Sequence, residues 1–180
     1  MVVRRENEED AEAVRQVHLT AFGDHGATVA ELTDALRLLL SPSRGLSLVD
    51  EEDGAVVGHV MFSPSLLDAE PRLVEVAVLS PLGVQPDWQG RGIGASLVEA
   101  GIQAMIEQAA PVVFLEGDPA YYARFGFRRG GEQGFRRPSL RIPKRSFQAL
   151  CLPAHEPWMT GTLVYSEPFW RHDCVGLRQL

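Results

Sequence analysis

Residues 86–95 read PDWQGRGIGA and place glycine at positions 90, 92 and 94, immediately before an apolar run with helical spacing. We expect a strand to end near Val84 and a helix to begin near Gly90. The first amide groups of a helix have no intrahelical acceptor and lie at the positive end of its dipole. Glycine leaves these amides open to an anion, and Gln89 and Arg91 add donors beside them. The stretch therefore predicts a pyrophosphate-binding turn.

Two other nucleotide-binding patterns fit this stretch less well. A phosphate loop of the Gly-Lys-Ser/Thr kind needs a lysine, and the only lysine of the chain, Lys144, is far away. Gly90, Gly92 and Ala95 match the dinucleotide fingerprint GxGxxG/A, which expects an acidic residue about 20 positions later. Here Glu116 follows Gly90 by 26 positions. A plain tight turn before a closely packed helix is the remaining alternative.

Around this turn, segments with the apolar spacing of helices alternate with segments typical of strands. Apolar residues at helical spacing predict helices over residues 6–22, 28–40, 90–108 and 118–125. Short apolar or β-branched runs predict strands over residues 2–4, 46–49, 55–62, 73–79, 82–84, 111–115, 147–152 and 162–165. Pro81 has no N–H to donate, so we expect the strand to break at Ser80-Pro81. The order of elements predicts one α/β domain over residues 1–180 with a mixed sheet.

Composition restricts the function classes. The formal net charge of -7 argues against a general nucleic-acid-binding protein, whose surface is basic. The N-terminal sequence has no apolar signal region, and no run approaches the roughly 18 apolar residues of a membrane helix, so we expect a cytoplasmic protein. Cys151 and Cys174 are expected to be reduced thiols. His155, His172 and Asp173 lack the paired spacing of a metal site, so no metal is expected.

Three blocks of the sequence resemble the GNAT superfamily of acetyl-CoA-dependent N-acyltransferases. They are residues 2–22, residues 79–102 and the stretch GDPAYYARFGF at residues 117–127, which is most similar to the bacterial YhbS-like branch. Gln89, Gly92 and Gly94 fill the family pattern Gln-x-x-Gly-x-Gly. The resemblance implies a mixed, mostly antiparallel central sheet flanked by helices, in which strands four and five splay apart. It also implies acetyl transfer from acetyl-CoA to an amine.

The resemblance assigns the acetyl-CoA (coenzyme A) site mainly to backbone groups. The amide of Leu82 would contact the thioester oxygen, and Val84 would contact the pantetheine in the gap between strands four and five. The amides from Gly90 to Ala95 would hold the pyrophosphate. The full set of binding residues implied in this way is Leu82, Gly83, Val84, Gln89, Gly90, Arg91, Gly92, Ile93, Gly94 and Ala95.

The resemblance also places three side chains in catalytic roles. Tyr122 occupies the family position from which a phenol faces the sulfur and protonates the departing thiolate; packing against Phe125 and Phe127 is its structural alternative. A carboxylate is expected to accept the proton of the attacking amine. Glu75, the one charge in an apolar strand, and Glu116 are the candidates, whereas Asp118 suits a helix cap better.

The sequence does not identify the amine that accepts the acetyl group. Residues 124–145 hold eight basic residues and one acid, Glu132. This segment could assist the adenosine 3′-phosphate or an acidic substrate, could face RNA, or could be a solvated arginine-rich face, which is the preferred interpretation. Glycines at 130, 131 and 134 suggest a mobile loop near the acceptor. The aromatic tail at residues 152–170 suggests an acceptor pocket or a homodimer edge. An acyl-CoA sensor without turnover is the alternative function.

Overall fold

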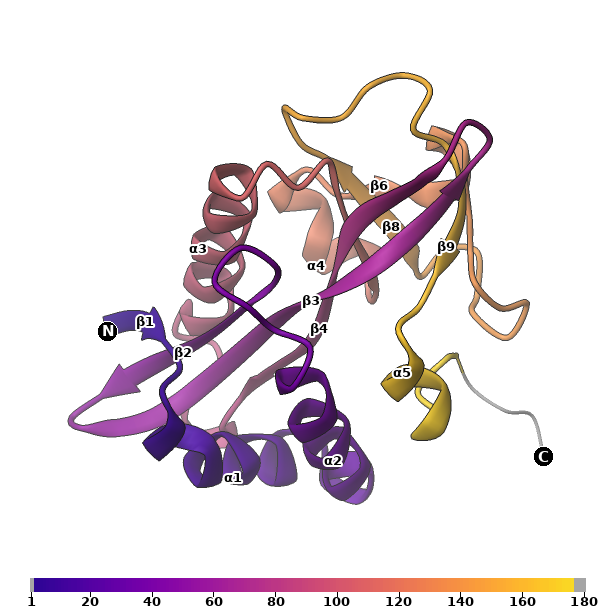
Figure 1. Cartoon of the computed structure of the whole chain (residues 1–180). Helices are drawn as coiled ribbons and strands as arrows, with labels where there is room; N and C mark the ends of the chain where they lie inside the picture. The colour runs from indigo at the N-terminus through magenta and orange to yellow at the C-terminus, as the bar shows by residue number, and fades with distance from the viewer. Residues whose placement is uncertain (1, 177–180) are drawn as a thin grey trace. The chain divides into compact units, whose positions relative to one another are not determined.

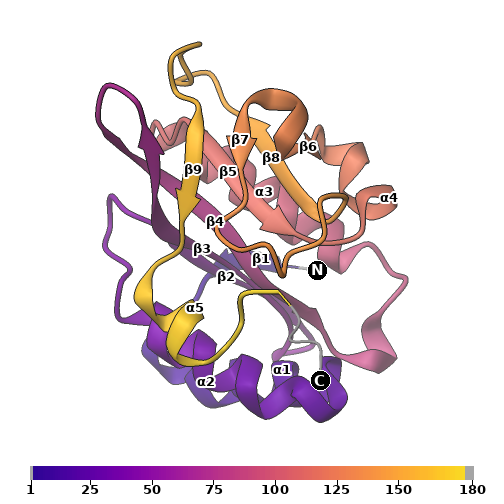
Figure 2. The ribbon, with the colours of Figure 1, turned by 90° about the vertical axis from the view of Figure 1, so that its right-hand side faces the viewer.

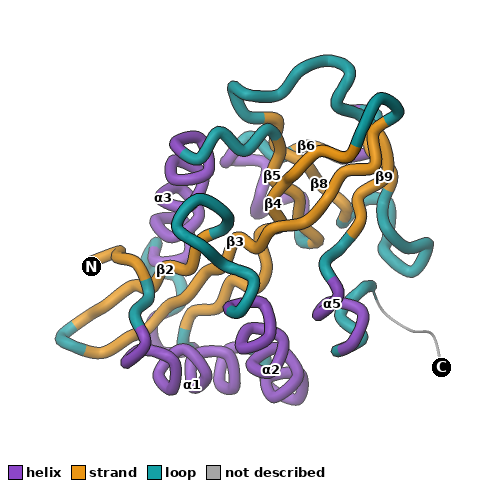
Figure 3. The backbone as a smooth tube through the Cα atoms, in the orientation of Figure 1, coloured by secondary structure: helices purple, strands orange, loops and turns teal. Residues whose placement is uncertain are grey.

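The structure, a computed structural model, describes residues 2–176. The chain forms two compact units, each built from two stretches of sequence: Met1–Ser63 with Leu79–Ala104, and Pro64–Val78 with Met105–Leu180. Three elements begin in one unit and end in the other, namely strands β3 (Ala55–Ala69) and β4 (Leu73–Val84) and helix α3 (Ile93–Glu107). Figure 3 shows β3 as one long strand. A single domain over residues 1–180 stays a prediction.

The first unit is built on antiparallel strands. Strand β1 (Val2–Arg5) pairs with β2 (Leu46–Glu52), and β2 pairs with the first half of β3. Asp53 and Gly54 join β2 to β3, and both residues have positive φ angles, of 51° and 79°. Such angles give a turn whose twist matches the strands that it joins, so β2 and the first half of β3 form a hairpin.

Two helices of this unit lie below β2 and β3 in Figure 1. Helix α1 (Ala11–Ala21) follows a 3-10 turn, η1 (Glu8–Asp10), which Asn7 caps by accepting a hydrogen bond from the amide of Glu9. Helix α2 (Gly26–Arg37) follows a second 3-10 turn, η2 (Gly23–His25). Apolar residues of α1 pack on β2 and β3 in a buried cluster of Val14, Val17, Val49 and Val56.

Helix α3 packs unusually close to β3. A Cβ atom on Gly58 would lie 2.8 Å from Ile93 Cγ2, and a Cβ atom on Gly101 would lie 2.0 Å from the ring of Phe62. The next strand residue, His59, contacts His18 of α1 instead. Because successive strand residues point to opposite faces, α1 and α3 cover opposite faces of β3.

The second unit is centred on β5 (Val112–Glu116). This strand runs parallel to β4, with Ala77 opposite Val113, and antiparallel to β8 (Phe147–Cys151). Strand β6 (Arg128–Arg129) pairs with β8. The second half of β3 pairs with β9 (Gly161–Val164), which also pairs with β7 (Phe135–Arg136), as Figure 2 shows.

Short helices connect and end these strands. They are η3 (Pro86–Trp88) in the first unit, and α4 (Pro119–Tyr122), η4 (Ala123–Phe125), η5 (Gly130–Gln133) and α5 (Glu167–Arg171) in the second. Asp118 caps α4, as predicted, by accepting a hydrogen bond of 3.0 Å from the amide of Ala120. The mixed, mostly antiparallel sheet with flanking helices is therefore confirmed. The splaying of strands four and five stays a prediction.

The structure corrects several sequence expectations. Strand β4 runs without a break through Pro81, so the predicted interruption there is wrong. Helix α3 begins at Ile93 and not at Gly90, because Gly90 and Gly92 have φ angles of +75° and +87°, which are not helical. Gly130 and Gly131 lie in the 3-10 turn η5 and Gly134 caps it, whereas the mobility expected of this segment stays a prediction. Strands β6 and β7, helix α5 and the second half of β3 were not predicted from the sequence.

Candidate active site

The glycine turn of the first unit presents a row of free amides. Among the described residues, no group accepts a hydrogen bond from the amides of residues 90–95. The bond that closes the first turn runs from the amide of Ser96 to the carbonyl of Gly92. Nothing lies within 4 Å of a Cβ atom built on Gly90 or Gly92, so the space beside these two glycines is open. This is the arrangement that an anion requires.

Side chains hold this turn in place. Gln89 Nε2 donates to the carbonyl of Val84 over 3.0 Å, and Arg91 Nη2 donates to the carbonyl of Asp87 over 2.9 Å. The Arg91 guanidinium also lies 4.7 Å from the ring centroid of Trp88. The amide of Gln85 donates to the carbonyl of Val57, which ties the start of the turn to β3. The two side chains expected to be anion donors thus bind the backbone of the turn itself.

In the second unit, Tyr122 lies at the carboxyl end of β5. Its ring approaches Gly117 so closely that a Cβ atom there would lie 2.5 Å from Tyr122 Cε2. The ring packs edge-on against Phe127, with 5.8 Å between centroids. Burial, with a smaller effect of Tyr121, raises the pKa of the Tyr122 phenol. Within residues 2–176 this hydroxyl has no hydrogen-bond partner, so a protonated donor is available to a ligand.

Glu116 ends β5, immediately before Gly117. Its carboxylate accepts a hydrogen bond of 2.8 Å from the hydroxyl of Tyr165. Burial raises the pKa of Glu116, and the hydrogen bonds from Tyr165 and from the amide of Gly176 oppose that shift only in part. A carboxylate whose pKa is raised accepts a proton more readily than an exposed one.

The other two carboxylates are placed differently. Glu75 is exposed on β4, and the register of β4 on β5 sets Ala77 opposite Val113. Glu75 is therefore level with position 111, five positions from Glu116, which corresponds to about 16 Å along the strand. Asp118 is occupied in capping α4. The structure thus brings Tyr122 and Glu116 to one end of β5 and leaves Glu75 toward the other end.

A chain of buried polar groups in the first unit was not found from the sequence. Arg37 Nε donates to Glu6 over 2.9 Å, and Ser47 Oγ donates to the other oxygen of the same carboxylate. Ser47 Oγ lies 2.8 Å from His59 Nε2, and His59 Nδ1 lies 2.7 Å from His18 Nε2. Burial alone would raise the pKa of Glu6, but its bonds to His59, Ser47 and Arg37 hold that pKa below its usual value.

The chain of buried polar groups ends at His18, which lies against Gly83 of β4. His18 Nδ1 is buried without a hydrogen-bond partner in the described part of the protein, and a Cβ atom on Gly83 would lie 2.9 Å from it. Burial lowers the pKa of both His18 and His59, so both imidazoles are neutral at pH 7. The signal in the sequence was His59 itself, a polar residue inside the apolar strand AVVGHVMF.

The described residues contain neither a cluster of metal ligands nor a membrane-spanning helix. Among residues 2–176 no three His, Cys, Asp or Glu side chains gather as a metal site would require, and Cys151 and Cys174 are free thiols. In the same residues no helix has the length and apolar character needed to cross a membrane.

Comparison with known proteins identifies the family. The model of the acetyltransferase (GNAT) domain matches residues 2–130. The uncharacterized N-acetyltransferase YjhQ of Escherichia coli (strain K12) is 31% identical over 163 residues, which are 88% of each chain. The structure of Escherichia coli YhbS in complex with CoA is 29% identical, with a TM-score of 0.82 over 94% of this chain and 92% of that one. A GNAT family acetyltransferase from Brucella melitensis, in complex with acetyl-CoA, is 33% identical, with a TM-score of 0.73 over 93% and 97% of the two chains. The chain belongs to the GNAT family of N-acetyltransferases, as the three sequence blocks predicted.

Proposed function

We propose that the protein transfers an acetyl group from acetyl-CoA directly to a primary amine. The observation that carries the proposal is the row of free amides at residues 90–95, in open space at the start of α3. These amides fit a pyrophosphate, and the CoA and acetyl-CoA of the YhbS and Brucella structures support this choice of anion. The backbone of Leu82, Gly83 and Val84 would contact the thioester and pantetheine.

Two side chains at the end of β5 support the chemistry. As the amine nitrogen bonds to the thioester carbon and the carbon–sulfur bond breaks, the leaving thiolate must gain a proton and the amine must lose one. Tyr122 is the proton donor to sulfur, because burial keeps its phenol protonated. Glu116 is the acceptor of the amine proton, because burial raises its pKa and it lies next to Gly117, which contacts the Tyr122 ring. The products are an N-acetylated amine and free coenzyme A.

Calorimetric titration with acetyl-CoA, combined with a thiol-release assay over a panel of primary amines, tests this proposal. We expect binding and amine-dependent release of one thiol for each amide formed. Binding without release on any amine would instead indicate an acyl-CoA sensor. Failure to bind acetyl-CoA would contradict both functions.

A further inference from the structure

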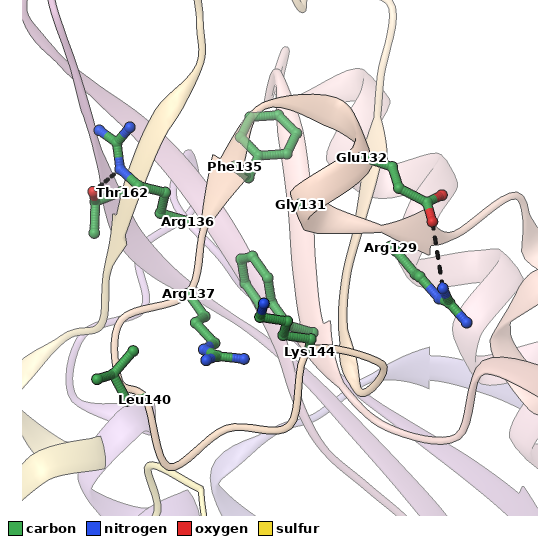
Figure 4. A pocket seen from close by; sticks show the side chains of 10 residues that line it. Arg129, Gly131, Glu132, Phe135, Arg136, Arg137, Leu140, Lys144 and Thr162 are labelled. Atoms are coloured by element: carbon green, nitrogen blue, oxygen red, sulfur yellow. Dashed lines mark hydrogen bonds and ion pairs between the residues drawn. The ribbon is translucent and has the colours of Figure 1, made fainter.

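The second unit contains a pocket of about 570 Å³, lined by residues between Arg129 and Phe147 and by Thr162. We call this the basic pocket. Turn η5 and strand β7 form one side, and the segment from Arg137 to Lys144 forms the other, as Figure 4 shows. Its volume lies within the range of small-molecule sites, which is roughly 300–1,000 Å³.

The floor of the basic pocket is apolar. Phe135 and Phe147 line it, and each residue is only 2% exposed to solvent. Leu140, at the rim, is 87% exposed. No atom lies within 4 Å of a Cβ atom built on Gly131, another lining residue, so this side is open. The pocket therefore combines an apolar floor with one side that is open to solvent.

The walls carry four basic side chains and one acid. Arg129 is paired with Glu132 at 3.5 Å, and Arg136 donates through Nε to Thr162 over 3.0 Å. Throughout residues 2–176 neither Arg137 nor Lys144 forms a hydrogen bond or an ion pair. Figure 4 shows the Arg137 side chain directed toward the middle of the pocket, whereas Arg136 turns outward to Thr162. Unpartnered cations beside an apolar floor favour an anionic ligand.

One lining residue of the basic pocket is the ladder partner of the candidate base, Glu116. In the antiparallel ladder of β5 and β8, Glu116 lies directly opposite Phe147. Side chains of such a pair point to the same face of the sheet, with Cβ atoms about 5 Å apart. Phe147 lines the pocket, so the carboxylate of Glu116 is on the face of the sheet that the pocket occupies.

We infer that the basic pocket binds the acidic group of the acceptor, which is a small amine that carries a carboxylate or phosphate on an apolar body. The inference rests on the proposed acetyl transfer. Arg137 and Lys144 would hold the acid, Phe135 and Phe147 would contact the apolar body, and the amine would extend toward Glu116. An arginine fork pairs with two oxygens of one carboxylate or phosphate, and a lysine adds a point charge.

The test compares amines that differ in one charge. We would measure acetyl transfer to 4-(aminomethyl)benzoate and to its neutral amide, 4-(aminomethyl)benzamide, and likewise to 2-aminoethyl phosphate and ethanolamine. We expect kcat/KM to be at least tenfold higher for the acidic member of at least one pair. Arg137→Gln and Lys144→Gln should each reduce that preference by about tenfold through KM, and should leave the KM for acetyl-CoA unchanged.

Arg171→Gln is the matched control, because Arg171 is an exposed arginine that pairs with Glu167 outside the basic pocket. It should keep the full preference. Equal kcat/KM for the acidic and neutral amines, or a preference that Arg137→Gln and Lys144→Gln leave intact, would overturn the inference while amine-dependent thiol release still supported acetyl transfer.

Binding of 4-(aminomethyl)benzoate, followed by NMR titration, needs no turnover and so tests the pocket even if acetyl transfer fails. We expect binding to wild type and to Arg171→Gln, and at least tenfold weaker binding to Arg137→Gln. Two results would assign the pocket to another ligand and overturn the inference. One is a loss of affinity for acetyl-CoA, but not for 3′-dephospho-acetyl-CoA, in the pocket variants. The other is tight binding of an RNA oligonucleotide that these variants abolish.

Discussion

His18 Nε2 lies 2.7 Å from His59 Nδ1, and both imidazoles are completely buried. The neighbouring bonds assign the protons of this pair. Ser47 donates to Glu6, so its oxygen accepts from His59 Nε2–H, and His59 Nδ1 in turn accepts from His18 Nε2–H. His18 Nδ1 is then an unprotonated nitrogen facing Gly83 of β4. The arrangement holds only while both rings are neutral.

The first prediction is that acid destabilises the protein from about pH 6.5 downward. Burial lowers the pKa of His18 and His59, so on unfolding each takes up a proton that the folded state does not bind. Stability is complete above the unfolded pKa of about 6.5 and falls by about 1.4 kcal/mol per pH unit for each histidine below it. Glu6, whose pKa is also lowered, adds a loss of the same sign below about pH 4.5.

Urea unfolding at pH 7.5, 6.0 and 5.0 measures this slope. His18→Gln should reduce the slope by about one proton, while His25→Gln, which removes an exposed histidine, should leave it as in wild type. A free energy of unfolding that does not change between pH 7.5 and 5.0 would contradict the neutral pair.

The second prediction concerns Gly92→Ala. Gly92 has a φ angle of +87°, so alanine there costs about 1–2 kcal/mol of stability, and its methyl group would enter the open space before the amides. We expect at least tenfold weaker binding of acetyl-CoA by calorimetry. Gly54→Ala is the matched control, because Gly54 has φ +79° and open space at the β2–β3 turn. Gly54→Ala should lose similar stability and keep its affinity for acetyl-CoA. Equal losses of affinity in the two variants would contradict the proposal that the turn at residues 90–95 binds the pyrophosphate.

The third prediction concerns Tyr122→Phe. Phenylalanine keeps the packing against Gly117 and Phe127 but removes the proton donor. We expect kcat to fall about 100-fold at saturating acetyl-CoA, with an unchanged dissociation constant for acetyl-CoA. Tyr121→Phe, which alters the adjacent ring, should retain activity. Unchanged turnover in Tyr122→Phe would remove its role as an acid.

The fourth prediction separates the two candidate bases through the pH dependence of kcat/KM. A general base must be deprotonated, so activity rises with pH through its pKa. Because burial raises the pKa of Glu116, this acidic limb should lie above the ordinary glutamate value of about 4.5. Glu116→Gln should abolish the limb, and Glu75→Gln should preserve both the limb and the rate. The opposite pattern would make Glu75 the base.

Much of the fold was predictable because local sequence determines it. The Asp-Gly turn, the Asn7 and Asp118 caps and the helical stripe of Ile93 and Leu97 each depend on neighbouring residues. The start of α3 was less predictable, because only the backbone angles of Gly90 and Gly92 show where helical geometry begins. Strand β6 has two residues, and pairing with β8 alone defines it.

The candidate site was predictable only where it follows from one segment. The proposed pyrophosphate-binding turn is formed by consecutive residues, 86–95, so its glycine pattern is visible in the sequence. The contact of His18 with His59 joins residues 41 positions apart on a helix and a strand, and no periodicity reports it. The choice between Glu75 and Glu116 depends on the register of β4 on β5, which separates them along the strands and which the sequence does not report. The role proposed for Tyr122 comes from the resemblance, because packing against Phe127 alone would not have indicated it.

The close packing at Gly58 and Gly101 bears on how strongly an anion can bind at residues 90–95. Because these two residues lack side chains, α3 rests directly on β3, and a single methyl group at Gly101 would collide with Phe62. Of the free amides at residues 90–95, those from Ile93 onward therefore belong to the start of a helix that the protein core anchors at two points, and those at 90–92 directly precede it. Folding has already fixed their directions, so an anion that binds there loses little entropy in ordering the chain. The proposed recognition of the nucleotide at this turn would in this sense depend on how tightly the interior is packed.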